Sequence, residues 1–301
     1  MTDRDPRILE QRIKDLELEL SERERDLAIF RNELTKANQQ LEKFITQIAQ
    51  ELQMAHLIQK ALVPTEFPNI PGFEFSTKFI PSSISGGDYF DVFEHDDRFR
   101  FGIVLANSSG YTMSALFLSV LLKMTGQIEA RRGSPPDKIL DLMAKELVPN
   151  IQNNDLANVL YAVIDRRSFE MQISGVGRYN ALLLSYGDNR LQRLENGVPP
   201  FQKGFKDSFK MTTVSLNPRD RLVLCTEGLI RAQNLKGEQF GEERLYKTVL
   251  AAPRLGVHEL RNEILYQVEK FAQGKEPPQD MTLIVTEVKD RVIKLAKNVD
   301  S

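Results

Sequence analysis

The segment SGGDYFDVF, residues 85–93, contains the residue types from which a metal site is built. Its two glycines leave the backbone open to close approach. The carboxylates Asp88 and Asp91 follow within a few residues, and carboxylate oxygens are the ligands that hard cations such as Mg²⁺ and Mn²⁺ prefer. The spacing predicts one corner of a divalent-metal site. Two acids do not complete such a site, so its other ligands must come from elsewhere in the chain.

The elements that would position this segment follow from the apolar patterns around it. Alternating residues in FEFSTKFI, DYFDVFEH and RFRFGIVLA are typical of half-buried strands. Further strands are predicted at residues 158–165, 169–175, 179–186, 210–216, 221–226 and 281–288, and helices at 112–130, directly after GSPPD, at 241–250 and at 256–272. This order predicts an α+β domain with antiparallel sheets and helices packed outside them.

A different pattern occupies the N-terminal part of the chain. Residues 8–62 contain neither glycine nor proline, and apolar residues recur there at alternating spacings of three and four, interrupted only by Arg23. A repeat of this kind keeps one stripe facing a partner helix and is typical of a coiled coil. The predicted seam consists of Leu9, Ile13, Leu16, Leu20, Leu27, Phe30, Leu34, Ala37, Leu41, Phe44 and Ile48.

The repeat predicts a homodimer formed through residues 1–62, followed by a globular domain at residues 63–301. After Ile48 an extra four-residue step to Leu52 makes a stutter, which locally unwinds a supercoil. The alternative is a single solvated helix packed against its own domain.

The bulk composition excludes several classes of partner. The net charge of −2 arises from 40 basic and 42 acidic residues, so we expect no attraction to nucleic acid or to anionic membranes. No apolar run is long enough to cross a bilayer, and the N-terminus MTDRDPRILEQR is too charged for a secretory signal. The single cysteine, Cys225, lies in the apolar run RLVLC and is expected in the core. A cytoplasmic protein is the simplest interpretation.

Five separated blocks carry a resemblance to a known family. They begin with ELQMAHLIQKALVPTEFPNIPGFEFSTKFIPSSISGGDYFDVF and continue with VLANSSGYTMSALFLSVLL, GVGRYNALLL, DRLVLCTEGLIRAQNLKGEQFGEERL and QDMTLIV. In order and spacing, over about residues 51–289, they resemble SpoIIE/RsbU-type phosphatases, a bacterial branch of the metal-dependent PPM serine/threonine phosphatases. The resemblance implies an α-β-β-α sandwich of two antiparallel sheets flanked by helices. It also implies hydrolysis of phosphoserine or phosphothreonine esters by a water that two Mn²⁺ or Mg²⁺ ions activate.

The resemblance assigns four metal-binding carboxylates, and this chain keeps only part of that set. Asp88 retains the first position. Asn107 stands at the second, which the resemblance makes the bridge between both metals, and Ser108 follows at the position of a backbone carbonyl ligand. Glu227 stands at the third position, one methylene longer than Asp, and Gln279 at the fourth.

These replacements lower the formal ligand charge from about −4 to about −2 against two divalent cations. Of the neighbouring acids, Asp91 is the better candidate to compensate, whereas Asp280 is expected to point to the face opposite Gln279. The turn after Ser108 carries Thr112 where the family has glycine, and Arg231 stands where many relatives have an acid.

We therefore expect a degenerate family member that is inactive or strongly impaired, with no cofactor or with weakly bound Mn²⁺ or Mg²⁺. Such a pseudophosphatase would bind or scaffold a phosphorylated STAS-domain protein of the anti-anti-sigma type, or an anti-sigma-type kinase. The first alternative is an active phosphatase with an unusual ligand set. The second is a structural protein that functions through its coiled coil alone.

Overall fold

The computed structural model describes residues 6–62, 64, 67–82, 87–109, 120, 123, 124, 130–151, 155–194 and 197–289. The chain divides into two compact units, Met1–Met54 and Ala55–Ser301. Most of the helix expected at 112–130 lies outside the described residues, as does Thr112. Within the described part of the chain, no helix combines the length and the apolarity that crossing a membrane requires.

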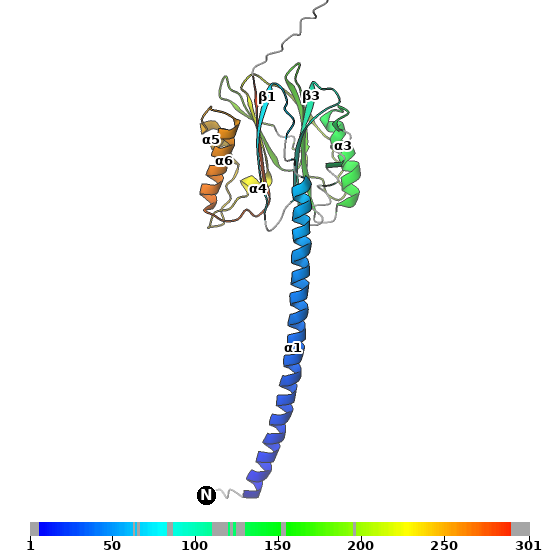
Figure 1. Cartoon of the computed structure of the whole chain (residues 1–301), viewed down its shortest axis with the longest axis vertical. Helices are drawn as coiled ribbons and strands as arrows, with labels where there is room; N and C mark the ends of the chain where they lie inside the picture. The colour runs from blue at the N-terminus through cyan, green and yellow to red at the C-terminus, as the bar shows by residue number, and fades with distance from the viewer. Residues whose placement is uncertain are drawn as a thin grey trace, which may run out of the picture. The chain divides into compact units, whose positions relative to one another are not determined.

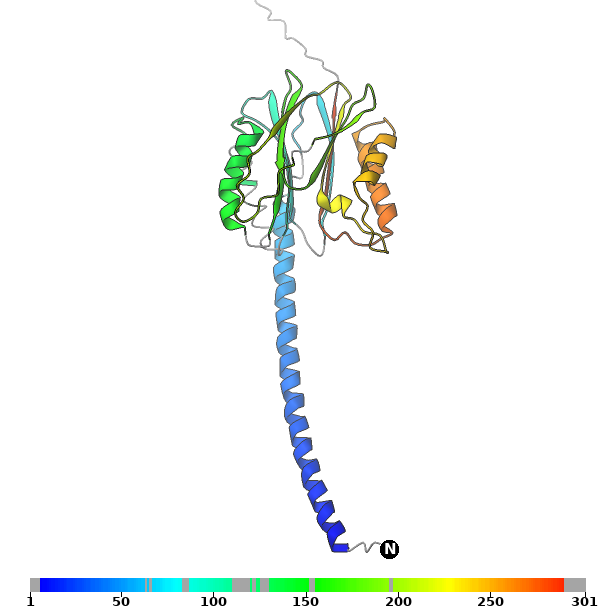
Figure 2. The ribbon, with the colours of Figure 1, turned by 180° about the vertical axis from the view of Figure 1, so that it is seen from behind.

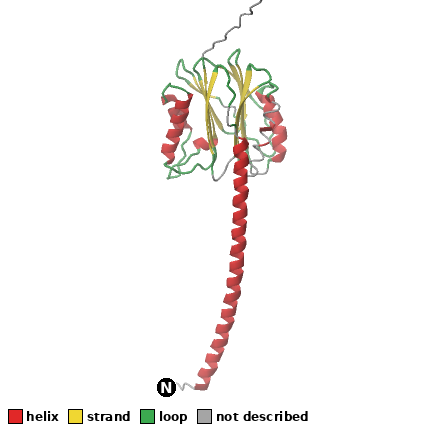
Figure 3. Cartoon of the chain, viewed as in Figure 1, coloured by secondary structure: helices red, strands yellow, loops and turns green. Residues whose placement is uncertain are grey.

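The N-terminal helix α1 is continuous from Pro6 to Leu62, as Figure 3 shows. Its length follows from a sequence without helix breakers. The seam residues expected to face a partner lie on this helix with exposed fractions between 40% and 63% (Leu9, Ile13, Leu16, Leu20, Leu27, Phe30, Leu34, Leu41, Phe44 and Ile48). The helix therefore presents an apolar seam that this single chain leaves uncovered.

The second unit contains two five-stranded antiparallel sheets, stacked face to face (Figure 1). Sheet A has the order β1 (Phe73–Ile80), β10 (Met281–Val288), β9 (Arg221–Thr226), β6 (Tyr179–Leu184) and β7 (Leu191–Arg193). Sheet B has the order β2 (Asp88–Glu94), β3 (Arg100–Ser108), β4 (Ala157–Asp165), β5 (Glu170–Val176) and β8 (Met211–Ser215).

Helices cover the outer face of each sheet, as Figure 2 shows from behind. Helix α3 (Pro136–Leu147), continued by the 3-10 turn η1 (Val148–Asn150), packs on sheet B. Helices α5 (Glu242–Ala251) and α6 (Val257–Ala272) pack on sheet A, and the short helix α4 (Glu227–Ile230) follows β9. The predicted α-β-β-α sandwich is confirmed.

Three apolar clusters hold these layers together. Phe101, Leu160 and Ile284 belong to the cluster between the two sheets. Two further clusters lie beneath α3 and beneath α5 and α6, and the latter includes Cys225, which is fully buried as expected. Because both faces of the central strands are covered, β4 and β10 are apolar over most of their length instead of alternating strictly.

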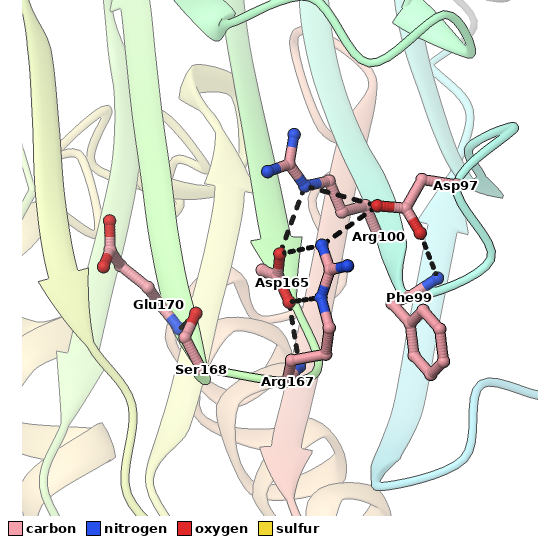
Figure 4. Close-up of polar contacts among 7 residues, drawn as sticks. All are labelled: Asp97, Phe99, Arg100, Asp165, Arg167, Ser168 and Glu170. Atoms are coloured by element: carbon pink, nitrogen blue, oxygen red, sulfur yellow. Dashed lines mark hydrogen bonds and ion pairs between the residues drawn. The ribbon is translucent and has the colours of Figure 1, made fainter.

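An ion-pair network ties together the end of sheet B where β3 begins and β4 ends (Figure 4). Asp165 accepts hydrogen bonds from Arg167 Nη2 at 2.7 Å and from Arg100 Nε at 3.2 Å. Arg167 also reaches Asp97, with 3.0 Å between Nη2 and Oδ2. The hydrogen bonds from Arg167 are the largest cause that holds the pKa of Asp165 below its usual range. Asn107 lies at the opposite end of β3.

Candidate functional site

Asp88 is buried at the start of β2, where the two sheets meet. Its strand register pairs it with Asn107 on β3, whose Nδ2 donates to Asp88 Oδ1 at 2.6 Å. From sheet A, the hydroxyls of Thr226 and Thr282 both donate to Asp88 Oδ2 at 2.7 Å. Three neutral donors from three separate strands therefore surround this carboxylate.

The environment of Asp88 disfavours its charge. Burial is the largest cause that raises the pKa of Asp88, followed by the negative charge of Asp280. The hydrogen bonds from Thr226, Thr282 and Asn107 oppose this shift, and the pKa lies at about 7. The hydroxyl and amide dipoles therefore offset only part of the cost of burying this carboxylate.

Asp280 lies directly before β10, and its carboxylate binds backbone. Oδ1 accepts from the Ser82 amide at 2.8 Å, and Oδ2 accepts from the amides of Gly87 at 2.9 Å and Asp88 at 3.3 Å. The two oxygens of this fully buried group bind the chain at Ser82, before the SGGD segment, and at Gly87 and Asp88, its last two residues. Asp280 therefore supports the loop that carries Asp88 and does not take the place of Gln279.

Asp91 lies on the face of β2 opposite Asp88, because a separation of three residues in a strand reverses the side-chain direction. Asp88 contacts sheet A across the sandwich, whereas Tyr89 and Phe93, on the same face as Asp91, pack in the cluster beneath α3. Asp91 Oδ1 accepts from the Val92 amide at 2.8 Å. The two acids that first suggested a metal site do not converge.

A chain of amide hydrogen bonds continues from Asp88 along the edge of the site. Asn158 Nδ2 donates to Asn107 Oδ1 at 3.3 Å, and the backbone N–H of Arg178 donates to Asn158 Oδ1 at 2.9 Å. Ser108 donates its N–H to the Gly87 carbonyl at 3.0 Å and so closes the β2–β3 end. The Gln279 side chain keeps a buried Oε1 without a hydrogen-bond partner among the described residues.

Glu227, the other retained acid, is bound by two arginines. Arg178 Nη1 donates to Glu227 Oε1 at 3.2 Å, and Arg231 Nε donates to the same oxygen at 2.8 Å. The Glu227 side chain is 11% exposed, whereas those of Arg178 and Arg231 are 74% and 38% exposed. Sequence reasoning singled out Arg231 but missed Arg178, because only the tertiary fold brings the β5–β6 turn beside α4.

These residues do not fit a two-metal centre. An amide N–H₂ group faces Asp88 where a carboxylate would bridge the cations, and two guanidinium groups already neutralise Glu227. Both kinds of group present positive charge or N–H donors, which repel a cation. Over the residues that the structure describes, no group of three or more His, Cys, Asp or Glu side chains is arranged to hold a metal ion.

Comparison with known proteins identifies the family of this chain. Residues 97–289 match the family described as Stage II sporulation protein E (SpoIIE). The chain belongs to the SpoIIE family. It is 22% identical over 253 residues to the phosphoserine phosphatase RsbP of Bacillus subtilis, an alignment that covers 82% of this chain and 60% of RsbP. The chain thus spans less than two thirds of that relative.

Solved structures share the fold. The SiaA-PP2C domain of Pseudomonas aeruginosa superposes with a TM-score of 0.66 at 21% identity, covering 81% of this chain and 97% of that domain. The RsbU and RsbW domains of a Mycobacterium tuberculosis protein give a TM-score of 0.62 at 19% identity, covering 75% of this chain and 64% of that one. The SpoIIE-family chain described here therefore has a PP2C-type phosphatase fold.

Proposed function

We propose that this SpoIIE-family protein is a pseudophosphatase, which binds a phosphorylated regulatory partner and does not hydrolyse its phosphate ester. The observation that carries the proposal is the set of donors on its two retained acids. Asp88 accepts from Asn107, Thr226 and Thr282, and Glu227 accepts from two arginines. Each acid has partners that a catalytic metal would have to displace.

The expected loss of activity is large. Removing even an outer-shell partner of a metal costs about 10–100-fold in affinity or activity. Replacing two ligand carboxylates by amides and lengthening a third therefore implies a loss of roughly three or more decades. In this proposal the protein carries no metal cofactor, or holds Mn²⁺ or Mg²⁺ only weakly.

For the partner, we propose a phosphorylated STAS-domain protein of the anti-anti-sigma type, or an anti-sigma-type kinase, acting in bacterial signalling in the cytoplasm. The name of RsbP as a phosphoserine phosphatase and the pairing of RsbU with RsbW domains in the mycobacterial protein support this class. A fold shaped to receive a phosphorylated surface can keep its docking face after its catalytic metals are lost.

The coiled-coil seam supports a homodimer as the working form. Assigning Leu27 and Leu34 to a positions and Phe30 to d places Asp26 at g and Arg31 at e, so a parallel, in-register pair brings these two charges together. Arg12 and Glu17 form the equivalent attractive pair, whereas Glu19 and Glu24 repel. The balance favours a parallel arrangement, which would bring two phosphatase-like domains to the same end.

Hydrolysis measured in millimolar manganese tests the proposal. The full chain is incubated with a phosphoserine peptide and with a chromogenic phosphate ester, beside the phosphoserine phosphatase RsbP of Bacillus subtilis as a positive control. We expect no turnover above the Asp88→Ala variant. Turnover that disappears in Asp88→Ala would instead support the active phosphatase, the reading that the retention of Asp88 and Glu227 favours.

A further inference from the structure

A cavity of about 400 Å³ opens beside Glu227 and is lined by charged side chains from several elements. Arg178 comes from the β5–β6 turn, Arg193 from β7, and Arg231 from the residue after α4. Glu227 and Glu242 provide the acids. Three guanidinium groups against two carboxylates give the lining a formal charge of +1.

The acids of this cavity are already engaged. Glu242 Oε2 lies 3.0 Å from Arg193 Nη2, and one oxygen of Glu227 is shared by Arg178 and Arg231. A guanidinium carries five N–H donors in a planar fork, so a single carboxylate oxygen uses only a small part of what two of them offer. Because both arginines are well exposed, their other N–H groups are accessible from solvent.

We propose that Arg178 and Arg231 bind the phosphoryl group of a phosphoserine or phosphothreonine side chain directly, without a metal, and that Glu227 occupies this site until the ligand displaces it. The inference rests on the proposed function and adds a residue-level site to it. A phosphate monoester carries up to two negative charges and three acceptor oxygens, which match two converging guanidinium groups better than one carboxylate does.

A buried acceptor in the same lining favours a phosphorylated peptide over free phosphate. Asn180, on β6, is 2% exposed, and its Oδ1 has no hydrogen-bond partner among the described residues. A buried acceptor without a partner is costly and is commonly satisfied by a ligand or by water. A phosphopeptide carries backbone N–H donors beside its phosphate, whereas inorganic phosphate can donate only through its own hydroxyl.

Calorimetric titration of the full chain in EDTA tests the site. The probes are the peptide Gly-Gly-phosphoserine-Gly-Gly, its unphosphorylated form, its glutamate-substituted form and inorganic phosphate. We expect the phosphopeptide to bind in the absence of metal and more tightly than the other three. Binding that appears only when Mn²⁺ is added would overturn the proposal, and so would equal affinity for the phosphorylated and unphosphorylated peptides.

Variants separate this site from a general electrostatic effect. Arg178→Ala combined with Arg231→Ala should weaken phosphopeptide binding about a hundredfold, because each of the two lost charge-assisted bonds is worth about tenfold. Glu227→Gln should tighten binding, since it removes the competing carboxylate without changing its size. The exposed Arg167, at the far end of sheet B, supplies the matched control Arg167→Ala, which should leave affinity unchanged.

Two outcomes distinguish a failure of the arginine site from a failure of the pseudophosphatase proposal. The double variant could fail to fold, which its thermal transition would show. The Glu227→Gln variant then still tests the site. Weaker or unchanged phosphopeptide binding by Glu227→Gln would contradict the proposal that phosphate displaces Glu227 from the arginines. If the wild type binds phosphopeptide without turnover and both Glu227→Gln and the arginine variants behave like wild type, this site is wrong while the pseudophosphatase proposal stands.

Discussion

At the residue scale, Asp88 is held by hydrogen bonds from three neutral side chains. In a two-metal centre the carboxylate charge would be balanced by cations. Here Asn107, Thr226 and Thr282 offset part of the cost of that charge as neutral donors, and Asp280 binds the Gly87 backbone amide next to Asp88. Because Asp88 is buried, its hydrogen-bond partners should contribute to stability.

The hydroxyl of Thr282 gives the first measurable consequence. Thr282→Val removes a donor to a buried carboxylate and should lower the free energy of unfolding by about 1.5–3 kcal/mol. Thr286→Val, on the same strand, removes a hydroxyl that donates to the Glu74 backbone carbonyl and should cost only about 1 kcal/mol. Urea denaturation of both variants checks the order. An equal loss in the two would mean that Asp88 gains nothing special from Thr282.

If the pseudophosphatase proposal is right, carboxylates placed at positions 107 and 279 should produce a response to metal. In Asn107→Asp with Gln279→Asp, a carboxylate replaces the amide that now lies 2.6 Å from Asp88, so like charges should destabilise the metal-free protein. Added Mn²⁺ should then raise the melting temperature by several degrees, because a ligand that binds only the folded state stabilises it. A thermal-shift assay compares this variant with wild type, for which we expect no manganese response. A manganese-dependent rise in melting temperature of similar size in the wild type would contradict the proposal that the wild type has no functional metal site.

At the element scale, much of the fold could be predicted from apolar periodicity. The strands expected at 221–226 and 281–288 have those bounds, and α5 and α6 begin within one residue of prediction. The three-residue β7 and the four-residue α4 were missed, because elements this short hold too few residues to establish a period. Their absence from the prediction mattered, since β7 and α4 carry or precede arginines of the charged cavity.

The candidate site was predictable only in part. The family motifs singled out Asp88, Asn107, Glu227 and Gln279. The sequence does not show which hydrogen-bond donors each of these side chains contacts in the fold. The contact between Arg178 and Glu227 joins residues 49 positions apart, and no local pattern marks it. The divergence of Asp91 from Asp88, in contrast, follows from strand geometry alone and needed only the correct period of two.

The ion-pair network at the β3–β4 end should set part of the acid stability of the fold. The hydrogen bonds of Asp165 to Arg167 and Arg100 hold its folded pKa below the unfolded value of about 3.9. The network therefore contributes its full stability above that value, and this contribution is lost as the pH falls through it towards the lower folded pKa.

Asp165→Asn should accordingly flatten the decline in unfolding free energy below about pH 4. Urea denaturation at a series of pH values measures the slope. Asp207→Asn, on an exposed loop, is the matched control and should keep the wild-type slope. If the unfolding free energy falls with pH equally steeply in the wild type and in Asp165→Asn, the ion-pair network does not contribute to acid unfolding.

At the scale of the whole molecule, the exposed seam of α1 is the surface on which we expect a partner helix. A helix this long with an apolar stripe and mostly polar other faces gains most of its stability from packing, not from propensity. A second copy of the same seam is the simplest cover, and the pairs formed by Arg12 with Glu17 and by Asp26 with Arg31 would fix its direction.

Sedimentation of the full chain tests this dimer. Leu34→Lys places a charge at an a position and should shift the equilibrium to monomer, because two lysines would be buried against each other in the seam. Gln39→Lys introduces the same charge at the outward-facing f position and should leave the dimer intact. If both variants sediment as the wild type does, the seam is not the interface. If the phosphopeptide affinity also changes in Leu34→Lys, the helix couples assembly to the arginine-lined cavity.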